Sequence, residues 1–147
     1  MGLLHPKGQI RVTTTAVGHR TEAYIIARFM AVGYNVLKPV AGDLRYDLVI
    51  EDADGQFWRV QCKTGRIEED GAVIRFWCRS NTRGEKRGLH YKGQVDYFAV
   101  YSPDLNTVYL VPANDLPETV GTLRFKENRK FKEHGGGGVR WAQDYEL

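Results

Sequence analysis

Three side chains that could act together chemically fall on two consecutive segments that alternate like strands: Asp47, Gln61 and Lys63. Carboxylate and amide oxygens are ligands for hard divalent cations, and a lysine beside them supplies a positive charge. The same residues would also be ordinary on a half-exposed hairpin, where a carboxylate near a lysine is often only a surface pair. The first question is therefore whether the fold brings the three side chains together.

The hairpin's register follows from its turn and from its side-chain alternation. A two-residue loop, Asp54-Gly55, would pair Asp47 with Cys62, whereas a three-residue loop, 53–55, would pair Asp47 with Gln61. With the three-residue loop, one face consists only of apolar or aromatic residues: Tyr46, Leu48, Ile50, Trp58, Val60 and Cys62. The other register mixes polar and apolar residues on both faces, so burial favours the three-residue loop. Opposed Cβ atoms are then ~5 Å apart and diagonal ones ~7–8 Å apart, which predicts one cluster of Asp47, Gln61 and Lys63.

A fourth candidate, Glu22, lies on a predicted helix from about Thr15 to Val32, with Thr15 as the N-cap and Gly33 as the stop. Its apolar stripe holds Ile25, Ile26 and Phe29. A glutamate near a helix start is favourable to the helix dipole wherever it points. That explains its place along the helix but not its place on the packing face, so we expect Glu22 to point toward the sheet.

The rest of the chain predicts an α+β fold in which the leading helix packs on a mixed, mostly antiparallel sheet. The predicted strands are Asn35–Val40, Tyr46–Asp52, Gln56–Thr64, Ala72–Arg79, Asp96–Tyr101 and Thr107–Pro112, and a helical turn is predicted over Ala113–Leu116. Residues 1–147 should form a single domain, with a loose N-terminal arm over 1–14 and a flexible Gly-rich loop and tail over 133–147.

Composition excludes several classes of protein. Two cysteines, Cys62 and Cys78, are too few for the disulfide framework of a small secreted protein, and the four histidines lack zinc-ligand spacing. No apolar run reaches the ~20 residues of a membrane helix, so we expect no membrane association and a cytoplasmic location. The net charge of +3 permits a nucleic-acid partner without requiring one.

The candidate residues resemble the PD-(D/E)XK nuclease superfamily, whose pattern is a glutamate on the first helix, an aspartate at a strand start and (Asp/Glu)-x-Lys on the next strand. Here the pattern reads Glu22, Asp47 and Gln61-Cys62-Lys63. The chain looks most similar to the homing endonucleases encoded in group I introns and more distantly to archaeal Holliday junction resolvases. The resemblance covers Thr15 to Pro112 and implies a restriction-endonuclease-like core.

Two positions depart from the superfamily pattern. Tyr46 stands where proline is usual, which matters little because that proline does not contact metal. Gln61 stands where an acid is usual, so Asp47 and Glu22 are the only formal anions of the site and metal affinity should be lower. The intron-encoded branch looks like a user of glutamine here. A catalytically silent DNA-binding module of the same fold is the alternative that Gln61 keeps open.

The resemblance implies Mg²⁺-dependent, site-specific hydrolysis of double-stranded DNA, with Mn²⁺ able to substitute, leaving 5′-phosphate and 3′-hydroxyl ends. Asp47, the Gln61 carbonyl and the Cys62 backbone carbonyl would hold the metal, and Glu22 would hold a second metal or position water. Lys63 would orient the attacking water or neutralise charge on the phosphate. A structure-specific nuclease such as a junction resolvase is the alternative within the same enzyme class.

We expect DNA contacts from the basic, aromatic side of the fourth predicted strand and the stretch after it: Arg75, Trp77, Arg79, Ser80, Asn81, Arg83, Lys86, Arg87 and Lys92. On charge alone, such a run would be a solvated loop. Cutting both strands needs two active sites, so a homodimer or homotetramer is expected. Its interface could use late aromatic residues, which could instead complete the chain's own core: Tyr97, Tyr101, Tyr109, Phe125, Phe131 and Trp141.

Overall fold

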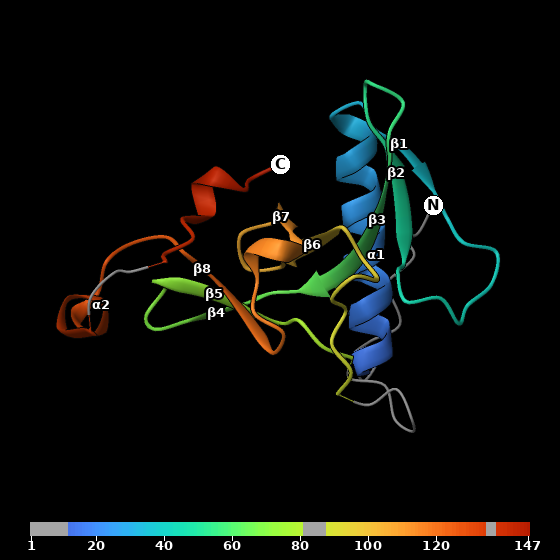
Figure 1. The fold of residues 1–147 in the computed structure, drawn as a ribbon. Helices are drawn as coiled ribbons and strands as arrows, with labels where there is room; N and C mark the ends of the chain where they lie inside the picture. The colour runs from blue at the N-terminus through green and yellow to red at the C-terminus, as the bar shows by residue number, and fades with distance from the viewer. Residues whose placement is uncertain (1–11, 81–87, 135–137) are drawn as a thin grey trace, which may run out of the picture.

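A computed structural model describes residues 12–80, 88–134 and 138–147 of the chain (Figure 1). The helices are α1 (Thr14–Ala31) and α2 (Arg129–His134), with 3₁₀ turns η1 (Ala113–Asp115) and η2 (Ala142–Asp144). The strands are β1 (Asn35–Leu37), β2 (Leu48–Glu51), β3 (Phe57–Thr64), β4 (Arg66–Glu68), β5 (Val73–Trp77), β6 (Tyr97–Ser102), β7 (Thr107–Pro112) and β8 (Val120–Arg124).

The N-cap of helix α1 lies two residues earlier than predicted. The hydroxyl of Thr13, not that of Thr15, accepts a hydrogen bond of 3.1 Å from the N–H of Ala16. Residues 13–15 are all threonine, so the cap could not be distinguished by residue type. The helix ends before Gly33, whose φ of 100° is in the left-handed region that glycine tolerates.

Five strands form a first sheet in the order β1-β2-β3-β6-β7, in which β3 and β6 are parallel and the other neighbours antiparallel. This confirms the predicted α+β class with a mixed, mostly antiparallel sheet. The β2–β3 register pairs Leu48 with Val60, which is the register of the three-residue loop. Gly55 ends that loop at a φ of 75°, as such a turn requires. The first strand is shorter than predicted and ends at Leu37.

A second sheet, in the order β4-β5-β8, was only partly predicted, because β4 and β8 had no clear strand signal. Strand β8 contains Gly121, where an added Cβ would lie 2.5 Å from the Phe76 ring. Glycine is unfavourable in a strand except where another group approaches closely, as this ring does.

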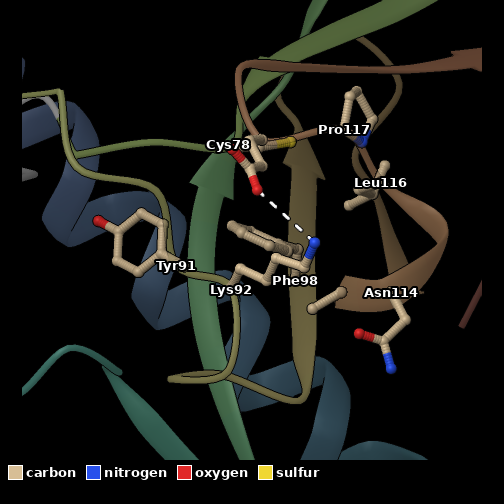
Figure 2. A pocket seen from close by; sticks show the side chains of 9 residues that line it. Cys78, Tyr91, Lys92, Phe98, Asn114, Leu116 and Pro117 are labelled. Carbon is tan, nitrogen blue, oxygen red and sulfur yellow. Dashed lines mark ion pairs between the residues drawn. The ribbon is translucent and has the colours of Figure 1, made fainter.

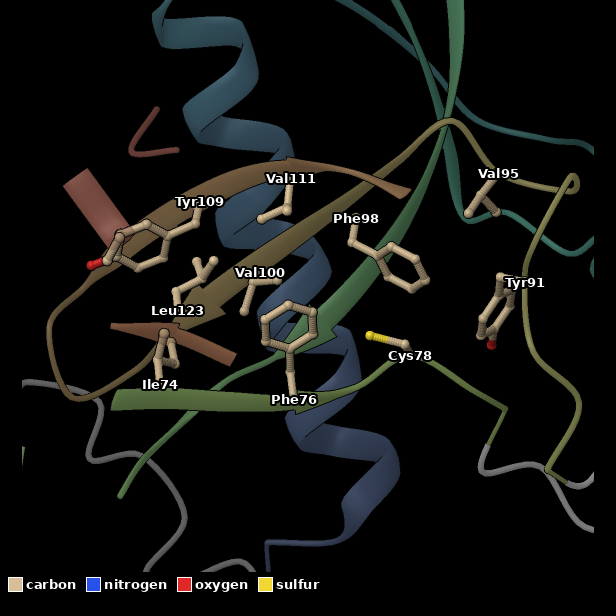
Figure 3. Close-up of a cluster of buried hydrophobic side chains, with 11 residues drawn as sticks. Ile74, Phe76, Cys78, Tyr91, Val95, Phe98, Val100, Tyr109, Val111 and Leu123 are labelled. Carbon is tan, nitrogen blue, oxygen red and sulfur yellow. The ribbon is translucent and has the colours of Figure 1, made fainter. Parts of the chain in front are cut away.

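The two sheets and α1 make three layers around two cores. One core lies between α1 and the first sheet and includes Ile25, Phe29, Leu48 and Val60. The other lies between the first sheet and the second, where Phe76 and Leu123 meet Phe98, Val100 and Val111 (Figure 3). The second sheet covers the β6–β7 half of the first sheet, whereas β1 and β2 lie on the side away from it (Figure 1).

The C-terminal residues 138–147 do not form the loose tail predicted from the sequence. The N–H of Leu110 donates to the Tyr145 carbonyl at 2.8 Å, and the N–H of Leu147 donates to the Val108 carbonyl at 3.0 Å. The tail is ordered because β7 is an edge strand whose free backbone groups need partners. Residues 135–137 and 1–11 of the two predicted flexible ends lie outside the described residues.

The late aromatic residues all contribute to the protomer's own packing, which was the alternative to a role in an interface between protomers. Tyr101 and Tyr109 are only 6% and 2% exposed. The other four pack in pairs with aromatic neighbours: Tyr97 on Trp58, Phe125 on Tyr109, and Phe131 on Trp141. In the described part of the chain, no helix is long and apolar enough to cross a membrane.

Candidate active site

Asp47 anchors the candidate site at the start of the β2 side of the hairpin. Its N–H donates to the Val60 carbonyl at 3.0 Å, which extends the β2–β3 ladder by one residue. Its Oδ2 accepts a hydrogen bond of 2.8 Å from the N–H of Cys62. The carboxylate therefore lies against the β3 segment that carries Gln61 and Lys63, as the predicted register requires.

Burial raises the pKa of Asp47 above its ordinary value, and the nearby Glu22 carboxylate raises it further. The Cys62 N–H and the ammonium groups of Lys63 and Lys38 act in the opposite direction. A partly buried carboxylate beside a second carboxylate is a position that gains from a cation.

Glu22 lies at the margin of the α1 packing face, with 23% of its side chain exposed. The buried stripe of α1 consists of Thr21, Ile25 and Phe29, and Glu22 follows Thr21 directly in sequence, so it lies next to the stripe and not within it. Its Oε1 forms an ion pair with Nζ of Lys38, a residue that sequence reasoning did not single out. Glu22 is therefore close enough to raise the pKa of Asp47, and its own charge is paired with Lys38.

Gln61 is 9% exposed, and the chain's described residues offer its side-chain amide no hydrogen bond. Its carbonyl oxygen is a ligand type that hard divalent cations accept, although it brings no charge.

Lys63 is the most perturbed charged residue of the site. Burial lowers its pKa from 10.5 to about 8, against the raising effect of Asp47. Its Nζ donates to the backbone carbonyl of Arg79 at 3.1 Å and lies 4.7 Å from the centre of the Tyr91 ring. A lysine held out of bulk water beside a carboxylate is typical of a functional site.

These donors fit a divalent cation, with a weaker set of charges than three carboxylates would provide. Among the described residues, no group of three or more histidine, cysteine, aspartate or glutamate side chains could hold a metal. Two carboxylates, Asp47 and Glu22, and the neutral Gln61 amide remain, which is the donor chemistry of a hard cation. Cys62 could contribute only its backbone carbonyl, because burial raises the pKa of its thiol well above 9.0 and keeps it protonated.

A pocket of about 230 Å³ lies on the other side of Tyr91, the residue whose ring Lys63 contacts. It is lined by Cys78, Tyr91, Lys92 and Phe98 with residues 113, 114 and 116–118 (Figure 2). None of the four predicted catalytic residues lines it. This pocket is therefore not the place where Asp47 would act.

The structure separates the predicted DNA contacts into four groups. Trp77 is 46% exposed, and the Arg79 guanidinium lies 4.9 Å from the centre of its ring. Arg75 forms ion pairs with Glu68 at 2.8 Å and Glu69 at 3.4 Å, which compensate its charge.

Ser80 and Lys92 form a third group and differ from each other in exposure. Ser80 is buried and its side chain hydrogen-bonds Tyr91, whereas Lys92 is exposed and 3.7 Å from Glu118. The last group lies outside the described residues: Asn81, Arg83, Lys86 and Arg87.

Sequence reasoning missed the residues that hold the site together across long separations. Arg45 donates from Nη2 to the Leu89 and His90 carbonyls at 3.2 and 3.0 Å, and from Nε to Gln94 at 2.7 Å. Its guanidinium also lies 4.2 Å from the centre of the Tyr91 ring. Neither Arg45 nor Tyr91 has a spacing signal, because their contacts depend on tertiary packing.

Comparison with known proteins identifies the class of the chain. Residues 12–147 match the family described as PD-(D/E)XK endonuclease. The match spans nearly the whole chain, so the protein belongs to this family and is a DNA-cleaving hydrolase. The resemblance predicted from Glu22, Asp47 and Gln61-Cys62-Lys63 is thereby confirmed.

A solved structure, titled as that of a bacterial homing endonuclease, I-Ssp6803I, is similar with a TM-score of 0.63. The two chains are 23% identical over 91% of this chain and 86% of that one, which establishes a shared fold. No curated protein matches this sequence.

Proposed function

We propose that the protein is a Mg²⁺-dependent, site-specific double-strand DNA endonuclease of the homing type, which also accepts Mn²⁺. The observation that carries this proposal is the packing of Asp47 against the Gln61–Lys63 segment, fixed by the 2.8 Å hydrogen bond from Cys62. The family supplies the reaction class, and the site supplies the residues that would perform it.

In this proposal Asp47, the Gln61 amide carbonyl and the Cys62 backbone carbonyl hold the cation, and Glu22 completes the set or positions water. The bound cation would polarise the scissile phosphate and lower the pKa of a water molecule. Lys63 uses one of its three N–H donors on the Arg79 carbonyl. Its remaining donors orient the attacking water or neutralise charge that develops on the phosphate.

Specificity is proposed to come from the exposed face of β5 and the segment after it. Trp77 is exposed and the half-buried Arg79 packs on its ring, so the two form an aromatic and basic pair. Arginine reads base edges, whereas lysines such as Lys92 mostly contact phosphates. Asn81, Arg83, Lys86 and Arg87 are proposed as further contacts, and Arg75 joins them if DNA displaces its two glutamates. Burial removes Ser80 from the proposed set.

This assignment of contacts has a direct test in binding assays with Ca²⁺. Replacing Lys92 with glutamine should reduce the log–log salt slope of DNA binding by about one, because one phosphate contact is lost. Arg79→Ala should weaken discrimination between DNA sequences by about tenfold, since one base contact accounts for ~1–3 kcal/mol. Unchanged slope and discrimination would show that this face does not contact DNA.

A homodimer or homotetramer is proposed because each chain has one candidate site and a double-strand break needs two. A cytoplasmic location is also proposed, and the two free cysteines, Cys62 and Cys78, support a reducing environment.

Cleavage of three substrates with Mg²⁺ tests the proposal: a linear duplex library, a four-way junction and a single strand. The expected result is cutting of the duplex at a defined sequence by an oligomer seen in sedimentation equilibrium. A monomer that cuts only four-way junctions, at any sequence, would make the protein a junction resolvase. DNA binding without any cleavage would make it a catalytically silent module.

A further inference from the structure

Tyr91 lies beside the candidate catalytic lysine without being part of the family's pattern. Its ring is 7% exposed and packs edge-on against Phe98 with ring centres 5.7 Å apart. The Nζ of Lys63 is 4.7 Å from the ring centre, within the range of a cation–π interaction. Lys63 therefore has two anchors, the Arg79 carbonyl and the face of Tyr91.

Both anchors belong to one small unit of backbone. Arg79 and His90 form an antiparallel bridge, and the N–H of Ser80 donates to the Leu89 carbonyl at 2.9 Å. The Tyr91 side chain also hydrogen-bonds Ser80. The acceptor and the aromatic ring that contact Lys63 are thus fixed relative to each other.

Arg45 connects this unit to the chain that carries the carboxylate. It lies two residues before Asp47 and donates to the Leu89 and His90 carbonyls. Its guanidinium is also stacked on Tyr91, 4.2 Å from the ring centre. The lysine anchor and the aspartate are therefore linked by one arginine.

We propose that Tyr91 is a positioning residue for Lys63, fixed in place by Arg45, and that its aromatic face directs the ammonium group toward the reacting phosphate. A lysine stem has four rotatable bonds and would otherwise sample many directions, which weakens a group that must meet a transition state. This inference rests on the proposed catalytic function of Lys63. Tyr91 itself contacts no substrate.

The test compares Tyr91→Leu, which removes the ring, with Tyr91→Phe, which keeps it. Tyr109→Leu is the matched control, because Tyr109 is buried in the same core and its ring packs edge-on with Phe125 rather than against Lys63. The first measurement is NMR of the Lys63 side-chain protons in EDTA, assigned with Lys63→Arg. Protons over an aromatic face resonate upfield, so wild type, Tyr91→Phe and Tyr109→Leu should share this shift and Tyr91→Leu should lose it.

The second measurement is the single-turnover rate of plasmid DNA cleavage with Mg²⁺, beside DNA affinity with Ca²⁺. Tyr91→Leu should lower the rate about tenfold, which a cation–π contact of ordinary strength can supply, without changing affinity. Tyr91→Phe should stay within about threefold of wild type. Should Tyr91→Leu not fold, Arg45→Met takes its place and should reduce both the upfield shift and the rate.

An unshifted Lys63 signal in the wild type would overturn the proposal, as would wild-type cleavage by a folded Tyr91→Leu or an equal loss of rate in Tyr109→Leu. Failure of the proposed function is distinguishable from these results. If the wild type cleaves no DNA, the nuclease assignment of the site fails, while the NMR comparison still decides whether Tyr91 positions Lys63.

Discussion

Lys63 should reduce the stability of the metal-free protein, because its charged form is unfavourable in the folded site. Its pKa of 10.5 falls to about 8, chiefly through burial. One pKa unit corresponds to ~1.36 kcal/mol, so the lysine lowers the free energy of unfolding by about 3 kcal/mol at pH 7. Lys63→Met retains a similar shape without the charge. At pH 7 the free energy of unfolding of this variant should therefore exceed that of the wild type by about 3 kcal/mol. The variant should also no longer cleave DNA.

The sign of the pH dependence follows from proton binding. Between pH 8 and pH 10.5 the unfolded chain keeps the lysine proton that the folded chain releases, so the stability of the wild type rises with pH in this range. The advantage of Lys63→Met should be about 3 kcal/mol at pH 7 and roughly half of that at pH 9.5. Urea unfolding in EDTA at both pH values measures it. If Lys63→Met were less stable than wild type at pH 7, or if its gain in stability did not depend on pH, burial of the charged Lys63 would not be what destabilises the folded protein.

Two further predictions concern the hairpin and its junction with the second sheet. Gln61→Ala should impair Mg²⁺-dependent cleavage and Gln61→Glu should stay partly active with an altered metal preference; a wild-type rate for Gln61→Ala would exclude the ligand role. Gly65→Ala should lower the free energy of unfolding by ~1–3 kcal/mol in urea titrations, because the added Cβ would lie 2.3 Å from Cδ1 of Ile74 and 2.9 Å from Val100. Unchanged stability would mean that these side chains move freely aside.

The hairpin could be predicted from sequence because its register has only two candidates, and burial of one face decides between them. The pairing of Leu48 with Val60 is the consequence. Glu22 was predicted to point at the sheet, yet it lies at the margin of the stripe with Lys38 as its partner. A helical pattern predicts which face of the helix a residue lies on to within about one position. It does not predict which side chain of another element will form an ion pair with that residue.

The second sheet and the surroundings of Lys63 could not be predicted for a different reason. Strand β4 has only three residues, Arg66–Glu68, and β8 contains Gly121, so neither shows a strand pattern. The contact of Lys63 with Tyr91 joins residues 28 positions apart through the packing of two sheets. Such contacts follow from the tertiary fold and leave no local periodicity.

Mg²⁺-dependent cleavage by the wild type and by Asp47→Asn tests most directly whether this hairpin is the active site. Asparagine can still accept the Cys62 hydrogen bond, so folding and DNA binding in Ca²⁺ should be nearly unchanged. Loss of the carboxylate should lower cleavage by at least about 10³-fold if Asp47 holds the cation. Cleavage by Asp47→Asn at the wild-type rate would contradict the assignment of this hairpin as the active site.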